Sequence, residues 1–487
     1  MRPIDGDSEN QTPTRIRYRV LGLAAGLAVI TYLDRVCFGA AAGSIAAALG
    51  LASATDLKWA FTAFTLAYGL FEIPTGRLGD RWGARGTLIR IVLLWSLFTA
   101  LTGAAGLEIG GTVLIGLSGL VAIRFLFGAG EAGAYPNLAR VIHDWFPRSD
   151  WERVQGYLWM SGRIAGGLTP LVWMLLVSGT GSWPGLVNWR GAFLLFGVIG
   201  IGWCLIFATV FRDRPDDHPS CNDAERRLIG RRGEATDRAE PIPWGAMFRS
   251  RSLWSLCLMY SLVTYGWIFD ISYFPAYFDR RFEVPETAIW GAVYKGAPLW
   301  VGAIGCVLGG YAVGAAQRLT GDRISARRLI GTAAMLLCAG CWFGARTTDD
   351  VHRFCLFVSL AGFGVDLTLG AAWASCQDLG GRHAGVIAAC MNTAGTAGAS
   401  LASWLTGTIV QRSIASTAAE QAIAVDRLDP AVRLASEMSG YDAVFISYAA
   451  VYLVAAICWW GIDPRRPIGS ETVATDSQDA PPIAETT

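Results

Sequence analysis

Apolar stretches of about 20 residues recur along the chain and are separated by shorter polar segments, as expected of membrane-spanning helices. Their approximate positions are 19–41, 57–76, 87–106, 112–136, 153–178, 189–211, 252–278, 288–317, 326–345, 352–376, 383–410 and 442–462. The pattern predicts an all-α membrane protein with twelve transmembrane helices.

The longest polar interruption separates the first six stretches from the last six. It is rich in arginine and contains no apolar stretch long enough to cross a bilayer. The predicted organisation is a cytoplasmic tail (1–17), a six-helix bundle (18–211), a cytoplasmic linker (212–250), a second six-helix bundle (251–463) and a disordered cytoplasmic tail (464–487). Two linked bundles are a transporter architecture, with the substrate site near the middle of the membrane.

Arginines are distributed unevenly between the two sets of connections. One set contains Arg77, Arg81, Arg85, Arg140, Arg148, the linker cluster, Arg318, Arg323, Arg327, Arg328 and Arg382. On the other side, residues 42–56, 104–111 and 179–188 contain no lysine or arginine. Because positive residues stay on the cytoplasmic side, we expect both termini and the linker to be cytoplasmic.

Composition favours a membrane protein and gives no sign of catalytic chemistry. The chain is 53% hydrophobic and 16% charged, and soluble domains are about 25% charged. A net charge of +1 says nothing about partners, since the charges are divided among the loops; we expect no nucleic-acid partner. The eleven cysteines follow no metal-site or disulfide spacing. Metalloprotease, serine-hydrolase and phosphate-loop motifs are absent from the sequence, so we expect neither an enzyme nor a cofactor or metal.

Arg124 and Glu131 lie inside the fourth apolar stretch. Each charge should cost several kcal/mol there unless it is paired or wetted. A spacing of seven is two helical turns, about 10 Å of rise, so both side chains project from one face. A fixed positive charge beside a titratable carboxylate suits a proton-coupled carrier of organic anions. The alternative is a buried ion pair that only orients helices.

The segment Gly76-Arg77-Leu78-Gly79-Asp80-Arg81-Trp82-Gly83-Ala84-Arg85 joins the second and third stretches. It resembles the cytoplasmic loop signature of the major facilitator superfamily. The resemblance implies that Gly76, Asp80, Arg81 and Arg85 form a latch that locks the two halves in an outward-facing state. A degenerate copy at 309–323 has Gly314 where an aspartate is expected, so a second latch should be weaker or built differently.

Two further motifs resemble the anion–cation symporter family, which includes bacterial hexuronate, glucarate and galactonate transporters. They are Tyr32-Leu33-Asp34-Arg35 and the block from Arg124 through Glu131 to Pro136. The resemblance implies a monomeric, multi-pass protein of the bacterial inner membrane that carries a small carboxylate together with a proton. It implies protonation of Asp34 and Glu131, substrate contact or electrostatic attraction by Arg35 and Arg124, and hydroxyl or polar contacts from Tyr32, Tyr68, Asn392 and Trp373. For Tyr68 and Trp373 the alternative is simple packing.

Four charged residues depart from the sugar-acid pattern. Arg163 lies about a dozen residues into the fifth stretch, where it favours a substrate with more negative charge or several carboxylate contacts. The alternative is an arginine that snorkels to the cytoplasm. Asp270 and Asp366 lie in the seventh and tenth stretches. Either could balance Arg163 or add a proton site. Glu72 precedes Ile-Pro in the second stretch, where we expect a gate contact.

The predicted function is proton-coupled symport of a small organic anion by alternating access. An uncoupled or sodium-coupled facilitator remains open, as does a transport-inactive membrane sensor. The transported acid and the direction of flux stay undetermined by the sequence.

Overall fold

The computed structural model describes residues 12–51, 57–179, 185–230, 241–283, 289–465 and 467–468. Most of the predicted cytoplasmic tails, and residues 231–240 of the predicted linker, lie outside this part of the chain. The predictions made for those segments are therefore not tested.

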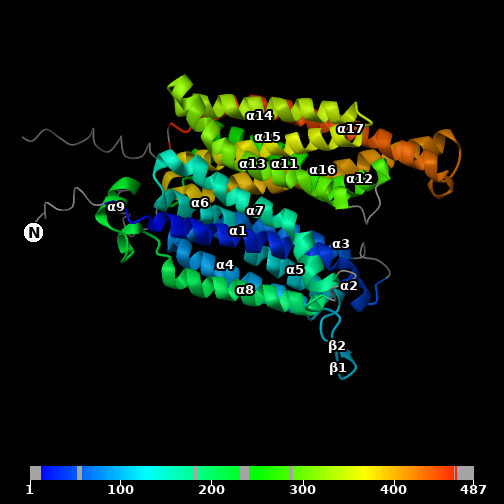
Figure 1. Ribbon diagram of the computed structural model, residues 1–487, viewed down its shortest axis with the longest axis horizontal. Coiled ribbons are helices and arrows are strands. Elements are labelled where there is room, and N and C mark those ends of the chain that lie inside the picture. The colour runs from blue at the N-terminus through cyan, green and yellow to red at the C-terminus, as the bar shows by residue number, and fades with distance from the viewer. Residues whose placement is uncertain are drawn as a thin grey trace, which may run out of the picture.

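The helices form two side-by-side bundles, one from each half of the chain (Figure 1). The first contains α1 (Ile16–Ala40), α3 (Lys58–Trp82), α4 (Ala84–Thr102), α5 (Leu117–Glu131), α6 (Ala134–Trp145), α7 (Trp151–Trp173) and α8 (Trp189–Val210). The second contains α11 (Arg251–Ser272), α13 (Ile289–Thr320), α14 (Arg323–Arg346), α15 (Val351–Gly380), α16 (Ala384–Glu420) and α17 (Pro430–Gly461). The bundles meet where α7 packs on α13 and α15, and where α3 and α6 pack on α16.

Short elements connect the long helices. They are α2 (Ala42–Ala48), the antiparallel strands β1 (Glu108–Ile109) and β2 (Thr112–Val113), α9 (Asp223–Ile229), α10 (Trp244–Arg249) and α12 (Phe274–Phe282). In Figure 1, α9 lies at one end of the bundles and the two strands lie at the other. We call these the linker end and the opposite end.

Many of the long helices are apolar enough to cross a membrane. Among the described residues, nine helical stretches are long and apolar enough to cross a membrane, or ten if one bent pair counts as a single span. One of the nine, Val351–Glu420, contains both α15 and α16. The protein is therefore an all-helical membrane protein, and the number twelve stays a prediction.

The fourth predicted span is divided in the structure. The sequence predicts one helix over 112–136, but α5 ends at Glu131 and α6 begins at Ala134. Gly133 has φ +82°, and a side chain there would also meet Thr75 of α3. Glycine permits this left-handed conformation, which ends one helix and redirects the chain into the next. The hydrophobic run continues through the break, so hydropathy alone does not reveal it.

Two helices in the second half are longer than predicted. α16 has 37 residues and α17 has 32, whereas the apolar pattern predicts 383–410 and 442–462. At 1.5 Å per residue, α16 is about 55 Å long, which exceeds the roughly 30 Å apolar core of a bilayer. The extra turns are polar, so they leave no apolar signal.

The start of the linker is bound to the first bundle. Glu225 of α9 accepts hydrogen bonds from Thr14 Oγ1, from the backbone amides of Ile16 (2.9 Å) and Arg17 (3.1 Å), and from Arg17 Nη1 (3.0 Å). Burial would raise the pKa of Glu225, but these hydrogen bonds outweigh it and hold that pKa below its ordinary value. Glu225 therefore stabilises the first turn of α1, whose amides have no acceptor within the helix.

We predict that Glu225→Gln lowers the stability of the detergent-solubilised protein by about 1–3 kcal/mol, because charged hydrogen bonds to the start of α1 are lost. The folded pKa lies below the unfolded value of about 4.3. The stabilisation should therefore be complete above that value and disappear as pH falls through the folded pKa. Apparent melting temperatures measured at a series of pH values test this.

Asp223→Asn in the same helix is the matched control, because Asp223 is exposed and, in the part of the chain that the structure describes, pairs at the surface with Arg226 alone. A gap between wild type and Glu225→Gln that widened in acid would contradict the role given to Glu225.

Candidate functional site

A cavity of about 410 Å³ lies between the two bundles. Residues from both halves line it. Those from the first half are Tyr32, Arg35, Phe64, Thr65, Tyr68, Tyr135, Trp159 and Arg163, and those from the second include Tyr260, Trp267, Ser272, Leu369, Asn392, Thr396 and Ser403. The size is in the range of small-molecule sites. Two arginines, several hydroxyls and aromatic rings form its walls.

Arg35 of α1 reaches the cavity and is held by Glu131. Its Nε lies 2.6 Å from Glu131 Oε1. The Arg35 side chain is 30% exposed, whereas that of Glu131 is 1% exposed and does not line the cavity. The guanidinium also lies over the Tyr68 ring, 4.7 Å from its centroid. The cation therefore faces the cavity, with its counter-charge behind it.

Arg124 and Asp34 lie deeper than Arg35. The Arg124 guanidinium packs over the rings of Phe38, Phe127 and Phe64, at 4.1, 4.6 and 4.8 Å. Within the described part of the chain, no carboxylate lies within ion-pair distance of it. Neither Arg124 nor Asp34 lines the cavity. Arg124 therefore lies behind the residues that line the cavity.

Asp34 accepts a hydrogen bond from Trp95 Nε1 and a long one, 3.4 Å, from Thr99 Oγ1, both on α4. Arg35, its neighbour in sequence, turns instead toward α5. The two adjacent residues thus serve different partners, as their angular separation on a helix permits.

Arg163 joins the two bundles through Asp366. Arg163 Nε and Nη2 donate to the two Asp366 oxygens at 2.8 and 2.7 Å, and Nη1 donates to Tyr32 Oη at 2.7 Å. Its guanidinium lies 4.3 Å from the Trp267 ring centroid. Arg163 is buried, so it does not snorkel. Of the alternatives left open by the sequence, balance by Asp366 is the one observed.

Glycines on α7 allow Tyr32 to approach Arg163. A Cβ on Gly162 would lie 2.6 Å from the Tyr32 ring, and one on Gly166 would lie 3.0 Å from it. The ring therefore occupies a notch that side chains would fill. This notch sets the Tyr32 hydroxyl against the guanidinium.

Asp270 is buried on α11 without an ionic partner among the described residues, and its Oδ1 has no hydrogen-bond partner. A Cβ on Gly362 of α15 would lie 3.5 Å from Asp270 Oδ2. Gly362 is one helical turn before Asp366 on α15. The Asp270 carboxyl group, which projects from α11, therefore packs on α15 about one turn from Asp366. Neither residue lines the cavity.

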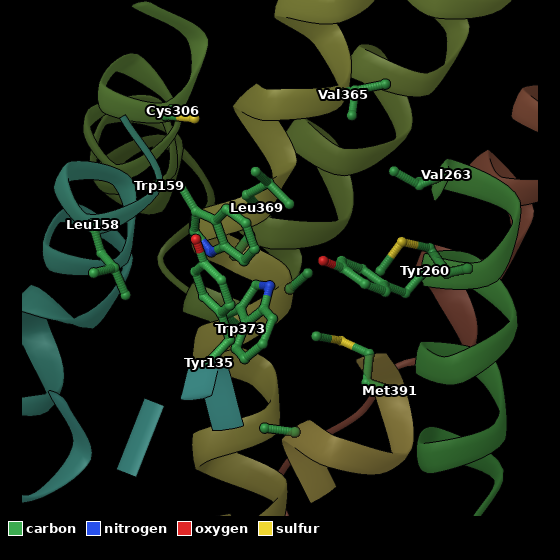
Figure 2. Packing of buried hydrophobic residues seen from close by; sticks show 14 of the residues in the cluster. Tyr135, Leu158, Trp159, Tyr260, Val263, Cys306, Val365, Leu369, Trp373 and Met391 are labelled. Atoms are coloured by element: carbon green, nitrogen blue, oxygen red, sulfur yellow. The ribbon is translucent and has the colours of Figure 1, made fainter. Parts of the chain in front are cut away.

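Aromatic side chains form a cluster at one wall of the cavity (Figure 2). Tyr135 and Trp159 stack with centroids 4.4 Å apart, and Trp373 packs on both at 6.2 and 5.4 Å. Tyr260 meets Trp373 edge-on at 6.2 Å. Trp373 is 1% exposed and does not line the cavity. It therefore supports the wall, whereas Tyr135, Trp159 and Tyr260, which the sequence analysis did not single out, face the space.

Asn392 of α16 lines the cavity and contacts α3. Its Nδ2 donates to Glu72 and, at 3.4 Å, to Tyr68 Oη, while Thr393 Oγ1 donates to Glu72 at 3.2 Å. Glu72 is fully buried. These contacts join the two halves beside the cavity, and a gate role for Glu72 stays a prediction.

The halves are also joined at the linker end through Asp80. Asp80 accepts from Arg140 Nη1 at 3.0 Å and from the backbone amides of Gly385 and Val386 at 3.1 and 3.0 Å. A Cβ on Gly76 would lie 2.7 Å from the Gly385 carbonyl oxygen, so glycine permits close contact here. Of the predicted latch residues, Gly76 and Asp80 lie at this junction.

Arg81 and Arg85 do not form the expected link between the halves. Arg81 lies 5.9 Å from the Trp82 ring centroid. Arg85 Nη2 donates to the Ala208 carbonyl, and its amide donates to Asp213. Both arginines thus make contacts within the first half and linker, and Arg140 on α6 supplies the cation that meets Asp80. The motif spacing could not reveal this, because Arg140 is 60 residues away.

A second junction has a different composition. Arg327 on α14 lies 2.7 Å from Glu152 of α7 and 2.7 Å from Asp378 of α15. Arg323 also pairs with Glu152, and Arg148 pairs with Asp378 at 2.5 Å. The second-half latch is therefore built differently, as the degenerate motif predicts. Both junctions hold the bundles together at the linker end.

The sequence matches a known protein family over most of its length. The sequence profile described as Major Facilitator Superfamily matches residues 24–403. The chain belongs to this superfamily.

Several relatives of the chain are named as transporters of organic acids. The chain is 31% identical over 390 residues to a probable sulfoacetate transporter of Cupriavidus necator, covering 78% of this chain and 84% of the relative. It is 30% identical to a probable L-galactonate transporter of Escherichia coli, covering 63% and 65%. It is 26% identical to a hexuronate transporter of Bacillus subtilis, covering 79% and 86%. The resemblance to sugar-acid transporters is confirmed.

Solved superfamily structures support the fold alone. A proton:xylose symporter superposes with TM-score 0.66 at 13% identity, covering 92% of this chain and 96% of that one. An inward-facing bacterial homologue of the lysosomal transporter Spinster superposes with TM-score 0.61 at 19% identity, covering 92% and 97%.

We predict that Asp80→Asn opens the linker end, because it removes the negative charge that the α16 amides and Arg140 share. Ala389 faces Gly76 across this junction and is fully buried. Maleimide labelling of an Ala389→Cys variant should therefore rise several-fold when Asp80→Asn is added.

Asp217→Asn is the control, because Asp217 is exposed in the linker. Equal labelling of the Asp80→Asn and control proteins would show that Asp80 does not hold the junction closed.

Proposed function

We propose that the protein is a proton-coupled symporter of a small organic anion, working by alternating access. The observation that carries this proposal is the Arg35–Glu131 pair, in which the cation faces the cavity and the carboxylate lies behind it. An anion can reach Arg35 without passing Glu131, and only one negative charge is needed to balance it.

Proton coupling follows from the environment of this pair. A substrate anion entering beside Arg35 adds a negative charge in a region of low dielectric constant, where an uncompensated charge costs several kcal/mol. Protonation of Glu131 removes one negative charge and frees the Arg35 guanidinium for the substrate. Asp34, buried near the same arginines, is a second candidate proton acceptor. Release reverses these steps.

Alternating access would use the junctions already described. The halves are tied together at the linker end by Asp80 and by the Glu152–Arg327 pair. If that end is cytoplasmic, as the arginine distribution favours, this conformation is outward-facing. Rocking of the bundles would break these contacts and expose the loaded cavity to the cytoplasm.

The substrate class is supported by the lining and by the relatives. Hydroxyl and amide groups of Tyr32, Tyr68 and Asn392 can bind hydroxyl or acid oxygens, while the arginines bind acidic groups. The relatives are named for sulfoacetate, galactonate and hexuronate transport. These observations favour a small carboxylate or sulfonate as the substrate. The proposed protein acts as a monomer in a bacterial inner membrane.

An uncoupled or sodium-coupled facilitator is the alternative within this class. It predicts uptake that ignores a pH gradient or that follows a sodium gradient. The buried Glu131 beside the partly exposed Arg35 favours a proton over sodium as the coupling ion. A proton neutralises a single carboxyl group, whereas a metal cation needs several oxygen ligands around it.

We predict that Glu131→Gln abolishes uphill uptake driven by a pH gradient. The ratio of substrate concentration inside to outside the proteoliposomes should then fall to about one. Exchange of labelled for unlabelled substrate should persist, because glutamine mimics the protonated acid and leaves Arg35 free for the anion.

Asp349→Asn serves as the control, since Asp349 is exposed and its one ion pair among the described residues is with Arg281. Accumulation by Glu131→Gln at the wild-type level would remove Glu131 from the coupling step.

A further inference from the structure

Two arginines line the cavity, and each is held by a carboxylate that does not line it. Arg35 pairs with Glu131, and Arg163 pairs with Asp366. We propose that the substrate is a small dianion whose two acidic groups replace Glu131 at Arg35 and Asp366 at Arg163. Each displaced carboxylate takes up one proton. This inference rests on the proposed function and adds the substrate's charge and the number of protons carried with it.

Tyr32 marks where the second acidic group would first meet Arg163, before that group takes over the two donors that Asp366 holds. Its hydroxyl accepts from Arg163 Nη1, and both residues line the cavity. A neutral oxygen thus occupies a place that an anionic oxygen would fill more strongly, since charge-assisted hydrogen bonds are about twice as strong. Tyr32 lies one helical turn before Arg35 on α1. Tyr32 and Arg35 are thus neighbours on α1, and Arg163 meets Tyr32 from α7, so both cations border the same cavity.

The charge balance requires a proton at Asp366. In the observed state Arg163 and Asp366 neutralise one another through a bidentate, buried ion pair. A second acidic group at Arg163 would leave one negative charge in excess unless Asp366 became neutral. A proton entering with the substrate adds to an Asp366 oxygen, and the Arg163 hydrogen bonds pass to the substrate. One dianion and two protons then leave the net charge of the site unchanged.

The surroundings of Asp366 allow only one negative charge. The titratable or charged groups that face it are Arg163 of α7, Tyr32 of α1, Asp270 of α11, Cys306 of α13 and Cys338 of α14. Arg163 is the sole cation among them. Asp270 has no ionic partner among the described residues, and an unpaired carboxylate at this depth is strongly disfavoured. Asp366 must therefore also be neutral once Arg163 turns to the substrate.

Replacement of Asp366 by the substrate at Arg163 would also weaken the contact between the two halves. Arg163 belongs to the first bundle and Asp366 to the second, so their pair is a direct link near the cavity. A monoanion held by Arg35 alone would leave this link intact. A dianion would break it and would loosen the bundles only when both ends of the substrate are bound.

The test uses matched acids in proteoliposomes with an imposed pH gradient. Galactarate and galactonate share a six-carbon skeleton but carry two and one carboxylates, and sulfoacetate and 2-hydroxyethanesulfonate form a second pair. We expect at least tenfold higher kcat/KM for a dianion than for its partner, two protons per dianion, and uptake insensitive to a potassium–valinomycin potential. Equal uptake within each pair, or one proton per dianion, would overturn the inference but leave proton-coupled anion transport standing. No pH-driven uptake of any of the four would remove both.

Variants separate the roles of the two residues. Arg163→Gln combined with Asp366→Asn keeps the site neutral and should abolish the dianion preference, with one proton per anion. Asp366→Asn alone keeps the cation, so dianion binding should persist while one fewer proton is carried and uptake becomes sensitive to the potential. Arg412→Gln, on the exposed far part of α16, is the matched control. Wild-type selectivity and two protons per dianion in either Asp366 variant would contradict the inference.

Discussion

Ionised side chains deep in a bilayer must be compensated, because each isolated charge there costs several kcal/mol. Arg35 with Glu131 and Arg163 with Asp366 meet this requirement across helices that are distant in sequence. Of the helices that carry them, α1, α7 and α15 line the cavity, and α5 lies behind α1. The pairs stabilise helix packing while the cavity is empty. In the mechanism that we propose, an arriving anion competes directly with the internal carboxylate.

The junctions at the linker end complement the pairs around the cavity. Asp80, Glu152 and Asp378 lie between the bundles at that end. Beneath the cavity, Glu72 and Asn392 add a further polar contact between α3 and α16. The two halves are thus joined by polar groups, which can separate and become hydrated without exposing large apolar surfaces. Such an interface suits a protein whose halves must move.

The sequence predicted the membrane class and most of the charged residues near the site, because hydropathy and buried charge are properties of single positions and short spacings. It placed Arg124 and Glu131 together, but Arg35 is the partner of Glu131 and Arg124 packs against phenylalanine rings. Helical spacing shows which face a side chain occupies and not which neighbouring helix meets that face. For the same reason, Arg140 was not recognised as the partner of Asp80. Hydropathy does not reveal the break at Gly133 or the polar extensions of α16 and α17. The aromatic residues of the cavity wall could not be distinguished by sequence, because the chain has twenty tryptophans and fourteen tyrosines.

The contact of Asp80 with Gly385 and Val386 uses main-chain groups at the start of α16. The first amides of a helix have no acceptor within it and carry partial positive charge. The contact therefore uses no side chain at position 386, but position 385 must remain glycine, because a Cβ there would lie 2.8 Å from Asp80 Oδ1 and 2.9 Å from the Gly76 carbonyl oxygen. Sequence drift could abolish the contact by altering the carboxylate, the helix start or either glycine. A change of α16 register would release it without any change of charge.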